Sequence, residues 1–443
     1  MSGPALPPAI DRLLDLAALP AMALPAAGRR MARISLFDWM VCGLAGADEP
    51  VSVRLRAAIG AEGGHPVASI IGGGAMPARA AALVNGATSH ALDYDDTHFG
   101  HVGHPSVAIF PAALAVAEEV GAGAAEMVDA FLIGAEASVR IGMLLGAAHY
   151  NRGFHQTATA GAFGATLAAG RLYGLPHGQM RAAIGLCASR ASGLKLQFGT
   201  MGKPLNAGIA ASNGVECAML AQAGLSATAD GLEGEQGFVP THSDAPVTAG
   251  DRHEPLPGRF LFEDVRYKLH ACCHGTHAMI EALAGLAAQG LTAADVAAIR
   301  LRTNPRWLRV CDIKAPRSGL EIKFSYAWLA GMVLSGIPTA AETAYTDACA
   351  ADPALAAFAR RVEVCGDADL SDMQAAAEVT LTDGRVRILA HDLAMNVPLA
   401  VLEANLRTKA QGLLGDRAGV LGAAVAGLDR LAARDFGVLL RRA

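Results

Sequence analysis

Charged and aromatic residues are scarce in this sequence. Of its 443 residues, 17% are charged, 5% are aromatic and 52% are hydrophobic, which makes the chain more apolar than an average globular protein. The 36 basic and 41 acidic residues are mixed along the chain and leave a net charge of −5. We therefore expect no nucleic acid and no anionic membrane as a partner. A chain of this length and composition predicts a large buried core, part of it at a subunit interface.

Signatures of disulfides, secretion and membrane insertion are also missing. The eight cysteines form no Cys-x-x-Cys pair, as is typical of a protein from a reducing compartment. The first residues, MSGPALPPAIDRLLDL, contain no basic segment followed by an apolar one, so they do not predict a signal peptide. The most apolar stretches, such as residues 327–341, are interrupted by Ser, Gly and Pro and are not expected to span a membrane. A cytoplasmic protein is predicted.

Common catalytic and nucleotide-binding motifs do not occur either. The sequence has no G-x-S-x-G, no Gly-rich phosphate loop with Lys and Ser/Thr, and no Rossmann fingerprint at a strand-to-helix turn. Each of these motifs has a fixed structural role in its enzyme class. Functions as a nucleophilic hydrolase, a kinase or a dehydrogenase therefore have no support.

What the sequence does contain, over its first 225 residues, is one helical pattern after another. Apolar residues recur at spacings of three and four, which predicts amphipathic helices. The expected helices span residues 29–45, 78–91, 105–120, 124–144, 155–173, 177–192 and 204–223. Many facing positions are Gly or Ala, so we expect these helices to pack closely.

The pattern changes near residue 226. A loop-like stretch at 227–257 precedes expected strands at 296–303, 361–365, 378–382 and 385–389, helices at 277–289 and 324–335, and further helices at 397–412 and 419–440. Asp383-Gly384 is a standard hairpin signal. We predict a mainly α fold: a large all-α domain built from both chain ends, residues 1–265 and 393–443, with a smaller α+β domain, residues 266–392, inserted between them.

Polar side chains gather between two of the predicted helices, at residues 90–104. This segment holds three aspartates and four histidines. Pro105 fits the first position of a helix, which makes His104 the cap of a helix whose free N–H groups could hold an anion. The segment could be an acid/base and carboxylate-binding loop, a metal site or a polar surface loop.

Two further side chains stand at predicted helix starts. His155 opens the helix at 155–173, although a single His in such a place is commonly structural. Lys203 directly precedes Pro204, where the helix dipole disfavours a cation unless an anion is shared. The Lys could therefore face a substrate carboxylate, or it could simply point into solvent.

A fourth segment, residues 267–277, is dense in Cys and His. Thr276 is a good N-cap for the helix that follows. The composition suggests zinc, but no second Cys or His pair lies at a finger-like distance. No metal is expected here.

Seven segments, taken together, carry a family resemblance. They are NGATSHALDYDDTH, GHPSVAIFPAALAVAEEVGA, GFHQTATAGAFGATLAAGRLYGL, GKPLNAGIAASNGVECAMLAQAGL, LEGEQGF, YKLHACCHGTHAMIEAL and EIKFSYAWLAGMVLSG. In sequence and in order they resemble the MmgE/PrpD family, which includes 2-methylcitrate dehydratase, cis-aconitate decarboxylase and iminodisuccinate epimerase. The resemblance implies that the α+β domain is a lid, that the active site lies in the cleft between the domains, and that the protein is a homodimer.

The resemblance also implies a role for each matching side chain. The catalytic residues would be His104, His155, Lys203 and Lys268. The substrate-binding residues would be Asp93, Thr97, His274 and His277. Removing a proton beside a carboxylate puts extra negative charge on that group; lysines and helix N–H groups could stabilise it, and a histidine could move the proton. No metal and no organic cofactor are expected.

The lid motif departs from the family pattern. Many members read Lys-Pro-Tyr-Pro-x-Cys-Arg-Phe-Thr-His, whereas this chain has His270 in place of the Tyr and His274 in place of the Arg. Arg is a fixed bidentate clamp for a carboxylate, while His is shorter and can be neutral. The change weakens the case for methylcitrate and favours a substrate with fewer carboxylates or a different third group.

The predicted function is that of a cofactor-independent lyase, a dehydratase or decarboxylase, acting on a small di- or tricarboxylic acid. An epimerase or isomerase of a dicarboxylate such as iminodisuccinate is the alternative within the family. A non-catalytic carboxylate-binding protein and a metal-dependent hydratase are alternatives from other classes.

Overall fold

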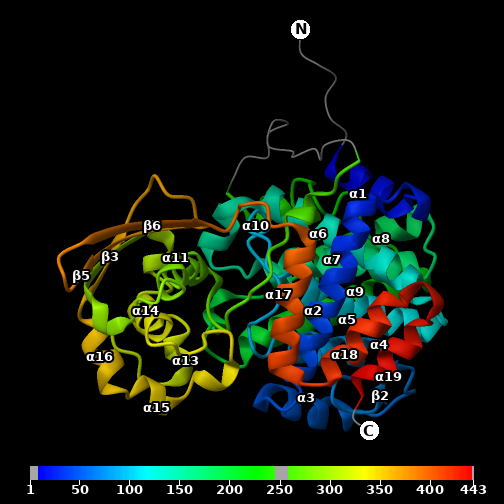
Figure 1. The fold of residues 1–443 in the computed structure, drawn as a ribbon. Coiled ribbons are helices and arrows are strands. Elements are labelled where there is room, and N and C mark those ends of the chain that lie inside the picture. The colour runs from blue at the N-terminus through cyan, green and yellow to red at the C-terminus, as the bar shows by residue number, and fades with distance from the viewer. Residues whose placement is uncertain (1–7, 245–257, 442–443) are drawn as a thin grey trace. The chain divides into compact units, whose positions relative to one another are not determined.

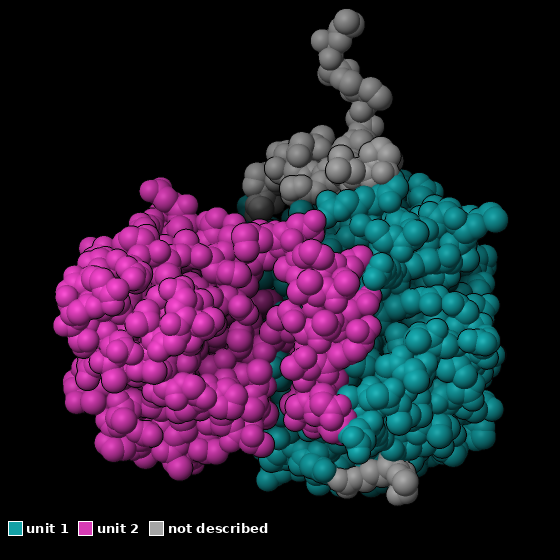
Figure 2. Space-filling view, viewed as in Figure 1, with its two compact units in different colours: residues 1–267, 416–443 teal, residues 268–415 magenta. Residues whose placement is uncertain are grey.

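The computed structural model describes residues 8–244 and 258–441, and it divides into two compact units. Unit 1 comprises Met1–Tyr267 and Asp416–Ala443, and unit 2 comprises Lys268–Gly415 (Figure 2). Helices dominate the described residues, so the mainly α prediction is confirmed. Part of the loop expected at 227–257 lies outside the described residues.

Unit 1 is built from helices that come from both ends of the chain (Figure 1). They are α1 (Ala9–Ala18), α2 (Ala26–Ala45), α3 (Pro50–Gly60), α4 (Ala78–Ser89), α5 (Pro105–Val120), α6 (Ala124–Arg152), α7 (Gln156–Leu172), α8 (His177–Ala188), α9 (Gly202–Gln222), α10 (Phe238–His242), α18 (Arg417–Ala426) and α19 (Ala433–Leu440). The short strands β1 (Ala68–Ser69) and β2 (Ala75–Met76) pair antiparallel. The last two helices return to this unit, where α18 packs on α2 and α19 packs on α5.

The centre of unit 1 is a stack of helices with very small contact residues. The buried helix α7 packs against α5, α6, α8 and α9. At the α6–α7 crossing Gly164 faces Gly134, and a Cβ added to Gly164 would lie 2.5 Å from the carbonyl oxygen of Gly134. Only glycine permits this approach of two backbones, and the close packing fixes α7 against α6.

This crossing gives a first testable prediction. Gly164→Ala is expected to destabilise the protein by about 1–3 kcal/mol, because the added methyl collides with backbone that cannot move aside. Gly178→Ala is the matched control, since no atom lies within 4 Å of a Cβ added to Gly178 in the first turn of α8. The control should leave stability unchanged or raise it by up to about 1 kcal/mol. Thermal unfolding of both variants measures the difference in stability. Equal losses of stability in Gly164→Ala and Gly178→Ala would contradict the close α6–α7 crossing.

Unit 2 contains a four-stranded mixed sheet and several helices. The strand order is β4 (Val362–Gly366), β3 (Val296–Thr303), β5 (Gln374–Leu381) and β6 (Val386–Asp392). β3 pairs parallel with β4 and antiparallel with β5, which pairs antiparallel with β6. The helices are α11 (His277–Ala287), α12 (Pro305–Leu308), α13 (Gly319–Ile322), α14 (Tyr326–Leu334), α15 (Asp347–Ala350), α16 (Pro353–Ala359) and α17 (Leu399–Leu414). α11 packs on β5, β6 and α14 and thereby covers one face of the sheet.

Two expectations about the C-terminal region differ from the structure. The helix expected at 419–440 is wrong as a single element, because Gly427 ends the helical run and α18 and α19 are separate. The compact division also places α17 in unit 2, whereas the expected helical domain resumed at residue 393. A helical pattern shows that a segment is amphipathic, but not which neighbour its apolar face contacts.

One helix of unit 1 has the composition of a membrane span. Within the described residues, α6 alone is long and apolar enough to cross a bilayer, and 72% of its most apolar window is buried in the structure. Burial of this extent is what a central core helix shows. α6 also departs from helical geometry at Gly146, whose φ is 64°, close to the end predicted for it at residue 144.

Candidate active site

The loop between α4 and α5 is held in place by contacts on both of its sides. Thr97 and Arg266 exchange backbone hydrogen bonds of 2.7 Å each. The Nε2–H of His98 donates to the carbonyl of Leu261 at 2.9 Å, while its Nδ1 accepts from the backbone N–H of His101 at 3.0 Å. Asp93 adopts a left-handed conformation with φ of 53°, which is unusual for a residue other than glycine. The loop is therefore held in one conformation, and Thr97 contributes to this through its backbone hydrogen bonds.

A buried carboxylate lies at the centre of this loop. One oxygen of Asp95 is 2.8 Å from Nδ1 of His90, and the other is 2.7 Å from Nδ1 of His104. The side chains of His90 and Asp95 are fully buried. Burial opposes the charge of this carboxylate, but the two histidines prevail and hold the pKa of Asp95 well below its usual range. Asp95 is thus an anion shared by two imidazole rings.

A second carboxylate pairs with the lysine at the start of α9. The Lys203 ammonium lies 2.7 Å from Oδ1 of Asp93, and Nε2 of His104 lies 3.5 Å from the same oxygen. The side chains of Asp93, Lys203 and His104 are 24%, 14% and 12% exposed, so a small molecule can reach them. Asp93 supplies the anion that a lysine at a helix N-terminus requires.

His155 caps α7, as the sequence predicted, and it lies beside this cluster. Its ring is 6.2 Å from that of His90, measured between centroids, and it meets the edge of Phe198 at 5.0 Å. Burial lowers the pKa of His155 well below its ordinary value, and Lys203, His90 and His104 lower it further. His155 is therefore a neutral imidazole at physiological pH.

The amide of Asn206 fixes the proton of His155. The amide nitrogen lies 3.2 Å from Nδ1 of His155 and 3.3 Å from the carbonyl oxygen of Leu194. A carbonyl can only accept, so the NH2 end of the amide must face both groups. Nδ1 of His155 is then the acceptor, and the single proton of the neutral ring is on Nε2.

Asp96, the next residue in the loop, belongs to a different network. It accepts hydrogen bonds from the backbone N–H of Ser106 at 3.2 Å and from the hydroxyls of Ser106 at 2.6 Å and Ser35 at 3.2 Å. Burial raises the pKa of Asp96 to about 7, against the hydrogen bonds from Ser106, and the nearby carboxylates of Asp95 and Asp38 raise it further. Two adjacent aspartates thus have opposite pKa shifts.

Asp96 gives a second prediction, for stability against pH. Its folded pKa of about 7 exceeds its ordinary value of 3.8, so the stability that it contributes is complete at low pH and is lost as the pH rises through about 7. Asp96→Asn removes this loss. Relative to wild type, the variant is expected to gain stability between about pH 4 and about pH 8. Chemical unfolding across this range measures it. Asp95→Asn should show no such gain there, because the pKa of Asp95 is lowered and its pH-dependent contribution to stability changes only below about pH 4.

Two histidines of the same loop do not join the cluster. His98 pins the loop, as described above, and burial lowers its pKa to about 4. His101 is buried against Gly103 and Gly142, where an added Cβ would collide with its ring, and burial lowers its pKa to about 3. Both rings fill structural positions.

The remaining predicted residues form a cluster of their own in unit 2. Lys268, His274 and His277 are all buried. The ring of His277 lies 4.5 Å from that of His274 and 4.9 Å from that of His270, measured between centroids. His270 is 3.0 Å from a carboxylate oxygen of Glu281. Burial lowers the pKa of His277 well below its ordinary value, and the neighbouring histidines and Lys268 add to this. This concentration of basic groups fits an anion-binding role.

The ligand types in unit 1 also fit a metal ion. The ligand atoms of His90, Asp93, Asp95 and His104 all lie within 4.8 Å of one another. Asp95, however, is shared by two imidazole rings, and Oδ1 of Asp93 contacts the Lys203 ammonium. A metal ion would have to displace these partners, so the arrangement fits proton transfer better.

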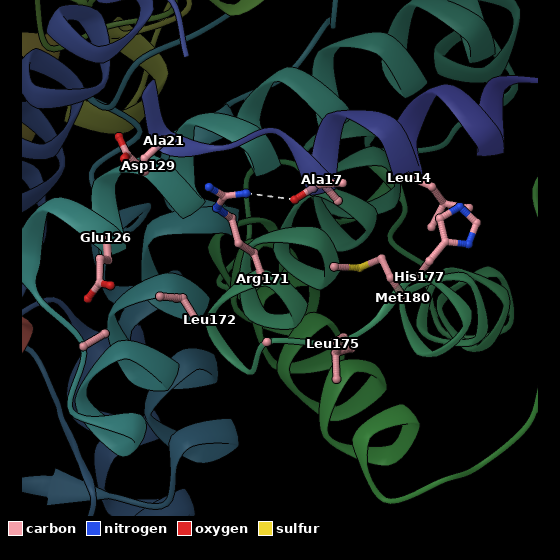
Figure 3. Close-up of a pocket in the computed structure, with 13 residues that line it drawn as sticks. Leu14, Ala17, Ala21, Glu126, Asp129, Arg171, Leu172, Leu175, His177 and Met180 are labelled. Atoms are coloured by element: carbon pink, nitrogen blue, oxygen red, sulfur yellow. Dashed lines mark hydrogen bonds between the residues drawn. The ribbon is translucent and has the colours of Figure 1, made fainter. Parts of the chain in front are cut away.

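A groove in unit 1 lies apart from these residues. It has a volume of about 470 Å³ and is lined by parts of α1, α6, α7 and α8 (Figure 3). One guanidinium nitrogen of Arg171 donates to the carbonyls of Ala17 and Leu19 at 2.8 Å each, and Asp129 is paired with Arg29. None of the predicted site residues lines this groove, and its central charges hold α1 in place.

Sequence reasoning missed three residues that complete the unit 1 site. His90 and Asp95 lay within the predicted loop but were given no role, and Asn206 was not considered. Asp95 stands beside Asp96 and cannot be told from it by residue type. Asn206 lies one helical turn after Lys203, which was the available signal that the two face the same side.

Comparisons with known proteins match both parts of the chain to one family. The model of the MmgE/PrpD N-terminal domain matches residues 16–249, and that of the MmgE/PrpD C-terminal domain matches residues 270–414. The cis-aconitate decarboxylase of Aspergillus terreus is 30% identical over 274 residues, 58% of this chain and 55% of that protein. The cis-aconitate decarboxylase of Homo sapiens is 33% identical over 168 residues, 37% of this chain and 35% of that protein. The matches to the Aspergillus proteins span little more than half of their length.

Proposed function

Because the chain belongs to the MmgE/PrpD family, we propose that it is a lyase that acts on a small di- or tricarboxylic acid by proton transfer next to a carboxylate. The observation that carries this proposal is the cluster of Asp93, His104, His155 and Lys203 in unit 1. It combines a partly exposed ammonium group with two imidazoles that contact different neighbours, a carboxylate for His104 and an amide for His155. A homodimer, a cytoplasmic location and independence from cofactors remain predictions.

Lys203 is the group that holds and stabilises negative charge. A substrate carboxylate can pair with the Lys203 ammonium in place of the Asp93 carboxylate, which contacts it in this structure. When negative charge develops next to that carboxylate, a preorganised cation stabilises the transition state more than the ground state. Within unit 2, the basic cluster of Lys268, His274 and His277 is proposed to bind carboxylates.

The two histidines have complementary roles. His155 is neutral and presents Nε2–H, so it acts as a hydrogen-bond donor, and it becomes the proton donor after taking up a second proton from solvent. His104 presents Nε2 towards Asp93 and Lys203 and acts as the base. An acid and a base whose protonation states are set by different neighbours are what elimination and decarboxylation need.

Decarboxylation of an unsaturated tricarboxylate of the cis-aconitate type is the first candidate reaction, because curated relatives carry that name. In this reaction the C–C bond to one carboxylate breaks and carbon dioxide leaves. The electron pair stays on the substrate, delocalised towards a second carboxylate near Lys203. His155 takes up a proton from solvent, passes it from the imidazolium to carbon, and returns to the neutral ring. Loss of hydroxide, for a dehydratase, would use His104 to remove the proton and His155 to protonate the leaving group.

An NMR assay in deuterated water tests the proposal. Purified protein is incubated separately with cis-aconitate, citrate, methylcitrate, malate and iminodisuccinate, and products and deuterium uptake are followed. Loss of carbon dioxide or water with deuterium on the adjacent carbon supports a lyase and identifies its substrate class. Deuterium uptake without elimination would favour the epimerase alternative. No exchange with any of the five acids would overturn the proposal.

The cluster of ligand atoms in unit 1 favours one competing function, a metal-dependent hydratase. Exhaustive chelation followed by elemental analysis distinguishes the two. The proposed lyase keeps its full activity without bound metal. A hydratase loses activity on chelation and regains it with an added divalent cation.

A further inference from the structure

The carboxylate of Asp95 is the least accessible part of the unit 1 site, yet it contacts two histidines. Its oxygens lie 2.8 Å from Nδ1 of His90 and 2.7 Å from Nδ1 of His104. The side chains of Asp95 and His90 are 0% exposed, while that of His104 is 12% exposed. Asp95 therefore cannot meet a substrate directly, and any effect on chemistry must pass through His104.

These contacts bear on where His104 carries its proton. Oδ1 of Asp95 accepts a hydrogen bond from Nδ1 of His90, while Nδ1 of His104 lies 2.7 Å from Oδ2 without the alignment of a hydrogen bond. An ionised carboxylate only accepts hydrogen bonds, so a neutral His104 ring that turns its single N–H to Asp95 carries it on Nδ1 and leaves Nε2 unprotonated. For His104, Nε2 is the nitrogen that faces Asp93, 3.5 Å away. For His90, Nε2 is buried and has no hydrogen-bond partner among residues 8–244 and 258–441.

The neighbouring histidines show that this protonation state is not general. His98 accepts through Nδ1 from a backbone N–H and donates through Nε2. His155 accepts through Nδ1 from Asn206, so its proton is also on Nε2. An Nδ1–H tautomer of His104 would be the opposite of that of His155, and such a difference would separate a proton acceptor from a proton donor within one site.

We propose that Asp95 is a positioning residue that holds His104 in the Nδ1–H tautomer, with Nε2 as the proton acceptor, and that His90 holds this carboxylate through a hydrogen bond to its other oxygen. The proposal rests on the proposed function for its catalytic consequence. The His90 bond matters because it satisfies Oδ1 of a fully buried carboxylate, whose Oδ2 is left facing Nδ1 of His104 at 2.7 Å. His90 does this without exposure to solvent.

The first measurement uses the wild-type protein and needs no substrate. Long-range 1H–15N correlation spectra of protein labelled on histidine report which ring nitrogen carries the proton. The spectrum of His104→Asn identifies the His104 signals. His104 is expected to be protonated on Nδ1 and His155 on Nε2. A His104 ring protonated on Nε2 alone would overturn the proposal, whether or not the protein turns over any acid.

The second measurement uses Asp95→Asn. An amide has one accepting oxygen, so one of the two rings must move its proton to Nε2. The spectrum of His104 or His90 is expected to change, and kcat is expected to fall by about 100-fold with little change in KM, as for other buried groups that orient a histidine. Asp96→Asn is the matched control, because it removes an adjacent buried carboxylate that does not contact His104. It should keep the His104 tautomer and turnover close to wild type.

The two readouts separate the possible failures. Absence of turnover in the wild type refutes the proposed function, while the tautomer of His104 still decides the role of Asp95. Full activity of Asp95→Asn, or equal loss in Asp95→Asn and Asp96→Asn, refutes the positioning role. If Asp95→Asn does not fold, the wild-type spectrum remains decisive.

Discussion

Lys203→Met is expected to lower kcat by about 1000-fold or more, since it removes the cation that stabilises the developing charge. Methionine keeps the length and the apolar stem of the side chain, so the start of α9 should remain intact. The Asp93 carboxylate loses its 2.7 Å partner, but its side chain is 24% exposed and can be solvated. Circular dichroism and thermal unfolding should therefore show a folded protein, while the NMR assay shows almost no product.

Lys195→Met is the matched control for this variant. Lys195 lies in the short 3-10 helix just before α9, and its ammonium donates to the carbonyl of Tyr150 at 3.0 Å and lies 3.6 Å from the centre of the Tyr150 ring. It carries the same charge, and its ammonium contacts Tyr150. Its loss should leave kcat close to wild type. Similar losses in both variants would point to a general electrostatic effect.

The Lys203→Met variant also distinguishes an enzyme from a binding protein. A binding protein that lost Lys203 would show weaker affinity for carboxylates and no other change. An enzyme loses a stabilisation that is stronger in the transition state, so kcat falls more than substrate affinity does. A rise in KM with unchanged kcat would contradict the role assigned to Lys203.

Much of the fold could be predicted where sequence signals mark both ends of an element. Helix α5 was predicted to the residue, because Pro105 can begin a helix and Gly121, with φ of 72°, can end one. Strand β3 was also predicted to the residue, from β-branched and apolar residues bounded by a turn. The helix expected at 419–440 failed because Gly427 lies inside an apolar pattern that continues beyond it. Periodicity alone does not show such a break.

The candidate site was predictable where a helix start fixes the geometry. His104 and His155 cap α5 and α7, and Lys203 lies in the first turn of α9. Their partners come from elsewhere in the fold: Lys203 pairs with an aspartate of the α4–α5 loop, and His155 bonds with Asn206 of α9. A single sequence does not show which helix starts meet in space.

The loop at 90–104 shows the limit of residue type as a signal. It contains four histidines, and two of them, His98 and His101, lie outside the cluster of His90, Asp93, Asp95 and His104. The direction of each ring depends on backbone turns, including the left-handed conformations of Asp93 and Val102. Neither residue is glycine, so no sequence signal marked these turns. Residue type predicted acid–base chemistry and the helix start marked His104, but only the structure selected His90.

His155→Gln is expected to lower kcat by about 1000-fold, within the range for loss of a general acid. Glutamine keeps an N–H donor of similar reach, but it cannot give up a proton. Deuterium incorporation at the substrate carbon should therefore fall together with turnover. Substrate affinity should change much less, because a hydrogen bond to the substrate can persist.

His149→Gln is the control for losing a buried imidazole. Burial lowers the pKa of His149 to about 4, and both of its ring nitrogens are bonded, Nδ1 to the carbonyl of His242 at 2.8 Å and Nε2 to the hydroxyl of Thr159 at 2.9 Å. With no nitrogen available to a substrate, this residue should matter for stability alone. His149→Gln should lower the melting temperature and keep most of the turnover. Equal losses of kcat in the two variants would make the role of His155 structural.

Asn206→Asp tests the protonation of His155 with the imidazole still in place. A carboxylate at this position can only accept, so Nδ1 of His155 would have to carry the proton, and a neutral ring would lose it from Nε2. The pKa of the ring should rise, because a negative charge would then lie about 3.2 Å away, where the amide nitrogen lies now. If His155 is the proton donor, kcat at neutral pH falls, and it recovers as the pH is lowered and the ring takes up a second proton. If His155 is instead a base, the same change makes it a stronger one and turnover rises. The two roles predict opposite signs for one substitution.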